Sequence, residues 1–227
     1  EGPGAQVVMA GSYDTSGYAQ GVAVSGGYAY VAASSEGLVV VDVSDPANPT
    51  YAGGYDTSGN ARGVAVAGGY AYVADYDEGL VVVDVSDPAN PTRAGSYDTS
   101  GSAWGVAVAG GYAYVADGYG GLVVVDVSDP TNPTRAGGYD TSGNARGVAV
   151  AGGYAYVADG GDGLVVVNVS DPTNPVRAGG YDTSGYARGV AVSGGYAYVA
   201  DGRGGLVLVD VSDPANLART GGYDTSG

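Results

Sequence analysis

The chain has 227 residues, enough to bury a sizeable core in one domain, and a formal net charge of −16 at pH 7. An acidic chain of this kind is a poor partner for nucleic acid or for anionic membrane surfaces, since both are bound through Lys and Arg. It contains no Cys and no His, which excludes disulfides and Ser-His-Asp or Cys-His catalysis. No apolar run approaches the roughly 18 residues of a membrane helix.

The pentapeptide YDTSG divides the chain into regular units. It begins at Tyr13, Tyr55, Tyr97, Tyr139, Tyr181 and Tyr223, with an interval of 42 residues each time. A fixed period of this length indicates that one unit cannot bury its apolar face alone and stacks on copies of itself. We therefore expect one domain over residues 1–227, with repeats at 13–54, 55–96, 97–138, 139–180 and 181–222.

Each repeat contains four candidate strands, which the copy beginning at Tyr139 illustrates. Residues 147–151 (GVAVA) form a first strand of small residues, and a Gly-Gly pair suited to a tight hairpin leads into 154–159 (YAYVAD). Residues 164–169 (LVVVNV) are apolar on both faces, as in a strand covered on both sides. After a turn rich in Ser, Asp and Pro, residues 176–182 form a weaker last strand.

Four short strands per unit, with no helical periodicity, predict an all-β, five-bladed β-propeller of four-stranded blades. The Gly/Ala-rich first strand suits the crowded axis, and the Val-rich third strand suits the space between neighbouring blades. The last strand, which carries Pro and Arg, suits the outer rim because both residues discourage pairing between sheet edges.

The repeats also resemble a known family. The sequence GLVVVDVSDP at Gly37, Gly79 and Gly121, with small changes at Gly163 and Gly205, is similar to the signature of LVIVD-repeat proteins. YDTSG and the GGYAYVAD segment match the rest of that repeat. The resemblance implies a β-propeller in proteins that are typically exported or displayed on bacterial and archaeal surfaces. It implies no catalytic residues, because the motif is a structural one.

The two ends of the chain carry one outer-strand sequence too many. Residues 9–17 (MAGSYDTSG) closely match residues 219–227 (RTGGYDTSG), so that five blades have six candidate outer strands. If a five-bladed ring closes on itself, the segment at 7–17 or the segment at 217–227 is surplus. A surplus strand can fill an open sheet edge on another copy, and head-to-tail donation of this kind builds a filament.

Sequence variation is concentrated in the loops of one face, which we call the upper face. Three arginines at equivalent positions of different blades form a candidate site for a glycan or a small anion. Its five predicted residues are Gln20, Arg62, Trp104, Arg146 and Arg188. The alternative is that each Arg pairs with a loop carboxylate such as Asp75, Asp159 or Asp201.

The acidic residues could also bind a metal. Without His or Cys, only a hard ion that prefers oxygen ligands, such as Ca²⁺, is plausible, and the densest acidic cluster is Asp75, Asp77 and Glu78. The alternative reading is that these and the other Asp residues cap turns by accepting hydrogen bonds from nearby backbone N–H groups. We expect no cofactor.

The sequence therefore predicts a non-catalytic, structural β-propeller outside the cell or on its surface. Nearly every Asp is repeated from blade to blade, which argues against a pair of carboxylates with different catalytic roles. The expected partner is a second copy of the chain, in an oligomer or a filament. The alternative function is a ligand-binding module that uses the arginines and the tryptophan of the upper face.

Overall fold

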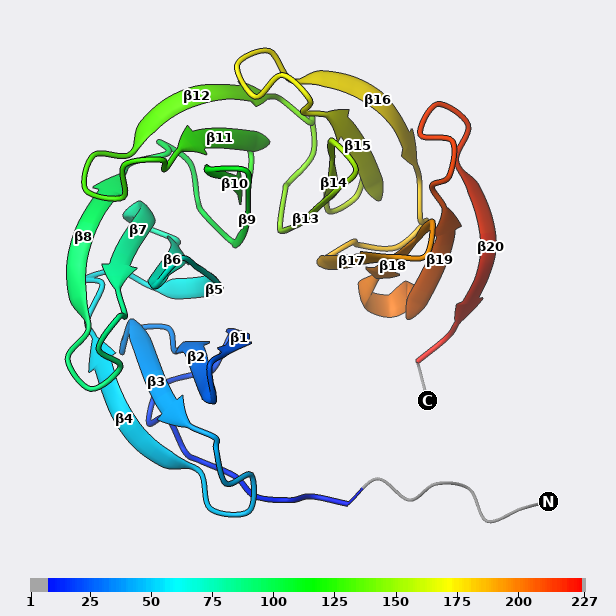
Figure 1. Cartoon of the computed structure of the whole chain (residues 1–227). Coiled ribbons are helices and arrows are strands. Elements are labelled where there is room, and N and C mark those ends of the chain that lie inside the picture. The colour runs from blue at the N-terminus through cyan, green and yellow to red at the C-terminus, as the bar shows by residue number, and fades with distance from the viewer. Residues whose placement is uncertain (1–7, 226–227) are drawn as a thin grey trace.

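The computed structural model describes residues 8–225 and contains five antiparallel sheets of four strands each, one per repeat. We call each sheet a blade and number the blades along the chain (Figure 1). Apart from one turn of 3₁₀ helix at Gly202–Gly204, the described chain is strands and loops. Within residues 8–225 there is no helix that is long and apolar enough to cross a membrane.

The strands have nearly the same bounds in every repeat. The first blade consists of β1 (Gly21–Ser25), β2 (Tyr28–Ala32), β3 (Leu38–Asp42) and β4 (Thr50–Tyr55), and the second of β5 (Ala61–Ala67), β6 (Tyr70–Asp75), β7 (Gly79–Asp84) and β8 (Thr92–Tyr97). The third consists of β9 (Gly105–Ala109), β10 (Tyr112–Ala116), β11 (Leu122–Asp126) and β12 (Thr134–Tyr139). The fourth consists of β13 (Gly147–Ala151), β14 (Tyr154–Ala158), β15 (Leu164–Asn168) and β16 (Val176–Tyr181), and the fifth of β17 (Gly189–Ser193), β18 (Tyr196–Ala200), β19 (Leu206–Asp210) and β20 (Ala218–Tyr223).

The strands of each blade follow one another in sequence order, from the centre of the molecule to its rim (Figure 1). The predicted order is therefore confirmed. Glycine is required at two places in this arrangement, in the hairpin turns and where the innermost strands of neighbouring blades approach each other. Gly26 and Gly27 take φ of 59° and 84° in the hairpin between β1 and β2, as the tight turn requires. At the centre, a Cβ on Gly63 would lie 2.9 Å from the carbonyl oxygen of Trp104 in the next blade, so only glycine fits there.

The outer strand of every blade bends at a β-bulge. The pairing of the third and fourth strands shifts at the same place in each repeat, between Val40 and Val41 in the first blade and between Val82 and Val83 in the second. A bulge inserts one unpaired residue and increases the local twist. The outer strands therefore curve along the rim of the molecule, as Figure 1 shows.

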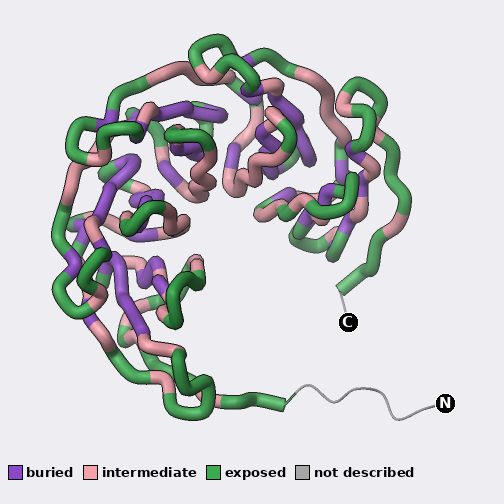
Figure 2. The backbone as a smooth tube through the Cα atoms, in the orientation of Figure 1, coloured by how far each residue is buried: buried purple, intermediate pink, exposed green. Residues whose placement is uncertain are grey.

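The core lies between the blades. Four apolar clusters each join one blade to the next, and the third strands supply their fully buried leucines and valines. Each blade has a leading face, toward the preceding blade, and a trailing face, toward the following one. Figure 2 shows the buried residues concentrated in the middle strands of the blades. One blade thus provides half of two separate cores.

The five blades form an open arc, with the first and fifth blades apart (Figure 1). Leu38, the trailing-face leucine of the first blade, is 0% exposed, whereas Leu206 at the same position of the fifth blade is 37% exposed. On the leading face of the first blade, Val22 and Val24 are 65% and 69% exposed. The prediction of five blades is confirmed. The blades do not close into a ring, since these two faces are not covered by another blade.

The two candidate surplus segments have different structures. At the C-terminus, β20 pairs with β19 and completes the fifth blade. The N-terminal segment, residues 8–17, forms no strand but lies against the first blade, where a Cβ on Gly11 would be 2.5 Å from the carbonyl oxygen of Pro46. The N-terminal segment is therefore the one without a sheet of its own. Residue 7 and residues 226–227 of the two predicted segments lie outside the described residues.

Candidate functional site

The five residues predicted on the upper face lie together. Each immediately precedes, or lies at the start of, the innermost strand of its blade, and together they line a cavity of about 340 Å³, which we call the axial hollow. The arc of blades brings equivalent positions of successive repeats side by side. This is why residues about 42 positions apart in sequence meet here. The lining residues are Gln20, Arg62, Trp104, Arg146 and Arg188.

The arginines of the axial hollow stack on aromatic rings. The guanidinium carbon of Arg146 lies 4.1 Å from the centre of the Trp104 ring, and that of Arg62 lies 5.1 Å from the same ring. Cation–π contacts of this kind are worth about 0.5–1 kcal/mol each when exposed and more when water is excluded. The stacking holds the positive groups close together without a carboxylate between them.

Two tyrosines extend this stack and were not among the predicted site residues. Tyr76 lies edge-on to Trp104, with ring centres 5.0 Å apart, and Arg62 is 5.5 Å from the Tyr76 ring. Tyr186 lies 5.2 Å from Arg146 and 5.8 Å from Arg188, and its hydroxyl accepts a hydrogen bond of 3.4 Å from Arg146 Nε. Both tyrosines are in the variable loops of the upper face, and that variation was the available signal in the sequence.

The arginines do not take the loop carboxylates as partners, which was the alternative reading. Asp159 accepts hydrogen bonds from the Thr141 hydroxyl at 2.6 Å and from the Gly143 backbone N–H at 3.1 Å. Asp75 accepts one from the backbone N–H of Asn60 at 2.7 Å. In the axial hollow, Arg62 Nε is buried without a hydrogen-bond partner. A buried donor left in this state costs roughly 1–3 kcal/mol.

The buried carboxylates, which lie outside the YDTSG motif, instead explain why the Thr of this motif is repeated. Its Asp accepts a hydrogen bond from the Ser two residues later, as Asp140 does from the Ser142 N–H at 2.9 Å, and Ser142 has a φ of 71°. This turn directs the Thr hydroxyl to the buried Asp of the next blade. Thr99 donates to Asp117 at 2.5 Å, and the equivalent Thr183 donates to Asp201. We call each Thr–Asp pair a clasp, because it ties the rim of one blade to the next.

Burial changes the protonation of the clasps. Desolvation raises the pKa of Asp117 and of Asp159 to about 6, and the hydrogen bonds from Thr99 and Thr141 only partly oppose that rise. The first blade has Ala33 at the equivalent position, also fully buried. A clasp is therefore absent at the first blade, and at the second the Thr57 hydroxyl is buried without a hydrogen-bond partner.

The candidate calcium residues are not arranged around one point. Asp75 is fully buried, whereas Asp77 accepts a hydrogen bond of 2.8 Å from the Asn60 side chain at the surface. Glu78 is an exposed loop residue whose backbone N–H donates to the Asp75 carbonyl. In the part of the chain that the structure describes, no three acidic side chains group so as to hold a metal ion.

The other repeated acidic residues cap turns, as their alternative reading proposed. Asp42 accepts a hydrogen bond from the Ser44 N–H at 2.9 Å, and Asp45 accepts one from the Ala47 N–H at 3.0 Å. Hydrogen bonds from Ser44 lower the pKa of Asp42, and the side chain of Asn48 lowers that of Asp45. These carboxylates therefore stabilise the lower-face turns as anions.

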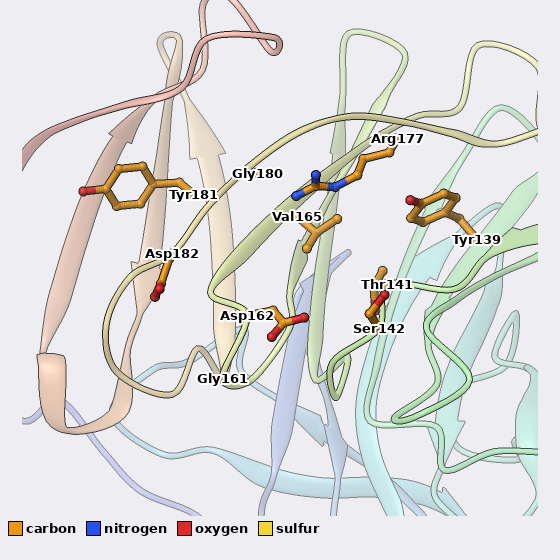
Figure 3. Close-up of a pocket in the computed structure, with 10 residues that line it drawn as sticks. All are labelled: Tyr139, Thr141, Ser142, Gly161, Asp162, Val165, Arg177, Gly180, Tyr181 and Asp182. Atoms are coloured by element: carbon orange, nitrogen blue, oxygen red, sulfur yellow. The ribbon is translucent and has the colours of Figure 1, made fainter.

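A second cavity, of about 430 Å³, lies at the rim between the third and fourth blades (Figure 3). Arg177 reaches over Val165 between Tyr139 and Tyr181, and Asp162 lies on the opposite side of the cavity. A similar cavity of about 370 Å³ around Arg135 recurs one blade earlier. Because the feature follows the repeat, we assign it to the fold. The axial hollow is the site that occurs once.

Comparisons with known proteins bear on the fold. The family model of the LVIVD repeat matches residues 16–57, 58–99, 100–141, 142–183 and 184–225. A comparison with curated proteins finds no match. Among solved structures, the chain is similar to the computationally designed Ika8 protein, with a TM-score of 0.68 and 10% identity, over 91% of this chain and 62% of that one.

Two natural proteins show the same similarity of fold. The β-propeller domain of Cps50 (Swd1) from Myceliophteria thermophila matches with a TM-score of 0.65 and 12% identity, over 92% of this chain and 73% of that one. A chain of a nidogen/laminin complex matches with a TM-score of 0.66 and 17% identity, over 91% and 80%. The chain thus spans 62% of the length of the designed protein, and 73% and 80% of the lengths of the two natural ones.

Proposed function

The chain belongs to the LVIVD-repeat family, and from this premise we propose that it is a non-catalytic structural module that associates with copies of itself through its two open blade faces. We further propose that it acts outside the cell or on the cell surface, the location that its resemblance to exported repeat proteins implied. The observation that carries the proposal is the 37% exposure of Leu206 where its four equivalents are 0% exposed.

The two open faces are complementary to each other. The leading face of the first blade and the trailing face of the fifth blade carry the residues that meet at all four internal interfaces. Leu206 corresponds to Leu164, which is fully buried against the fifth blade, and Val24 corresponds to Val66, which packs against the first. The fifth blade of one copy can therefore dock on the first blade of another with an interface that the chain already forms four times.

The energetics predict an association that depends on concentration. Full burial of a Val or Leu side chain contributes about 1.5–3 kcal/mol, whereas association costs about 4–15 kcal/mol in lost freedom. Several side chains must be covered together, and the open faces offer Val22, Val24, Leu206 and the half-buried Tyr198 and Leu208. Such a contact is heterologous, so it continues from copy to copy as a filament unless a ring closes.

The N-terminal segment is positioned to join two copies by strand donation. Gly11 approaches Pro46 of the first blade as Gly53 of β4 approaches Pro88 of the second, with Cβ positions 2.5 and 2.4 Å from the proline oxygens. Residues 8–17 thus follow the path of an outer strand that belongs to a preceding blade. If the fifth blade of another copy docks there, the segment reaches its β19 and replaces β20. The donated strand would then run on into β1 of its own chain.

The test is the mass of the 227-residue chain as a function of concentration, by light scattering and electron microscopy. We expect particles that grow with concentration, and filaments at the highest concentrations. Val24→Asp places a charge on the open leading face and should abolish growth. Val176→Asp is the matched control, because Val176 is 48% exposed on the rim strand β16 and outside both open faces.

Two outcomes would contradict the proposal. One is a parent chain that stays monomeric at millimolar concentration. The other is equal loss of association in Val24→Asp and Val176→Asp, which would mean that added negative charge, rather than the open face, prevents contact. Circular dichroism of both variants keeps a folding defect separate from an association defect.

A further inference from the structure

We propose that the axial hollow binds a small oxyanion that carries several negative charges, such as one with two phosphate groups or several carboxylates. The hollow is lined by three arginines, one glutamine and one tryptophan, in a chain whose formal net charge is −16. Like charges placed together repel one another, and their repulsion is relieved when an anion lies between them. This site is separate from the open faces and does not depend on self-association.

The contacts within the hollow leave its positive charge available. The loop carboxylates of Asp75 and Asp159 accept their hydrogen bonds from a Thr hydroxyl and from backbone N–H groups, not from the arginines. The guanidinium groups lie over aromatic rings, and the one hydrogen bond that they make in the hollow is from Arg146 Nε to the Tyr186 hydroxyl, so their other N–H groups can donate to a ligand. Arg62 Nε, buried and without a partner, is the donor that an anion would satisfy.

The same stacking argues against a neutral sugar as the ligand. Sugars bind proteins by lying on an open aromatic face, but both Arg62 and Arg146 lie within about 5 Å of the Trp104 ring centre. The ring at the centre of the hollow is therefore already covered by cations. Hydrogen bonds from planar guanidinium groups suit phosphate and carboxylate oxygens, which they can bind in pairs. The cavity of about 340 Å³ has room for a molecule of this kind.

Trp104 is the only tryptophan in the chain and lies in the hollow, so its fluorescence reports binding directly. We would titrate the chain with pyrophosphate at low ionic strength and expect a saturable change in Trp104 emission. Binding should weaken as sodium chloride is added, because salt screens the attraction. Acetate, with a single charge, should bind at least about tenfold more weakly than pyrophosphate, since it can occupy only one guanidinium group.

Matched variants place the binding in the hollow. The triple variant Arg62→Gln, Arg146→Gln and Arg188→Gln should lose at least about a hundredfold in affinity, measured by calorimetry as well as fluorescence. The control removes the same charge from the rim, as Arg93→Gln, Arg135→Gln and Arg177→Gln, and should bind as the parent does. Equal loss in the two triple variants would show that overall charge is responsible and would overturn the proposal.

Two further results would also overturn it. The first is no saturable change with the parent chain at millimolar pyrophosphate. The second is binding of glucuronate as tightly as pyrophosphate, which would assign the hollow to acidic sugars rather than to polyvalent oxyanions. Circular dichroism of both triple variants confirms that the blades remain folded.

Discussion

The internal interfaces and the open faces are built from the same residues, yet they differ in burial. Leu122 on the trailing face of the third blade is 0% exposed, and Leu206 on the trailing face of the fifth is 37% exposed. The pairing and register of the strands around the two leucines are the same. What differs is whether another blade follows. Burial in this protein is therefore a property of a pair of blades, and a single blade cannot supply it.

The largest expected effect uses this contrast directly. Leu122→Ala should lower the free energy of unfolding by about 2–5 kcal/mol, because it leaves a cavity between two packed blades. Leu206→Ala should cost about 1 kcal/mol or less at low protein concentration, since its side chain is partly in water already. Chemical denaturation of both variants measures the difference.

Protein concentration sharpens the same comparison. If copies associate through the open faces, Leu206→Ala should become more costly as the concentration rises, while the cost of Leu122→Ala should stay constant. Equal costs for the two variants at low concentration would contradict the assignment of Leu206 to an open face.

The second prediction concerns the clasps, which join the second to the third, the third to the fourth and the fourth to the fifth blade and are absent at the first blade. The folded-state pKa of Asp117 and Asp159 is about 6, above the usual value for an unfolded chain of about 3.9. Between these values the folded state binds more protons, so the contribution of these two groups to stability is greatest below about pH 4 and is lost as the pH rises through about 6. The expected loss is roughly 1–2 kcal/mol for each of these two carboxyl groups, allowing for partial screening.

Asp117→Asn should remove the contribution of one clasp and flatten the profile, as measured by denaturation at several pH values. Asp129→Asn is the control, because Asp129 is an exposed turn residue of the same blade and its pKa is lowered by the Thr131 hydroxyl. The Asp129→Asn variant should show the same decrease in the free energy of unfolding between pH 4 and 6 as the parent chain. An unchanged slope in Asp117→Asn would be evidence against the clasp.

The smallest effect on the stability of the single chain should come from Gly221→Val. A Cβ at Gly221 would meet only Leu208 Cβ, at 4.0 Å, whereas a Cβ at Gly11 would lie 2.5 Å from the Pro46 oxygen. If the N-terminal segment is donated, β20 is displaced from the interface, so Gly221→Val should assemble normally and Gly11→Val should not. Sedimentation of the two variants decides this, and the reverse result would mean that β20 stays in place when copies dock.

The sequence was sufficient to predict the repeated blades and the order of their strands, although not the repeated bulges and clasps. The period identified the blades, and the alternation of small, aromatic and branched residues placed the strands from centre to rim. The five residues of the axial hollow could be predicted because equivalent positions of neighbouring blades must lie close together. Features that depend on a single copy were harder to foresee, and Tyr76 and Tyr186 are examples.

The open arc could not be predicted from the sequence. The angle between neighbouring blades depends on how side chains such as Leu80 and Val123 pack across an interface, and the repeat pattern is the same for different angles. The partners of the arginines could not be predicted from the sequence either. Whether an arginine pairs with a carboxylate or lies over an aromatic ring depends on whether other loop groups already donate hydrogen bonds to Asp75 and Asp159. Both questions needed three-dimensional contacts.

The equivalence of the four internal interfaces has a consequence for how such a protein can change over generations. A gene that gains or loses one unit of 42 codons gains or loses a whole blade, and each new junction is one that the parent already makes. The size of the arc can therefore vary in whole steps without any compensating substitution. The near-identity of the third and fourth repeats is what a recent duplication of this kind would leave behind.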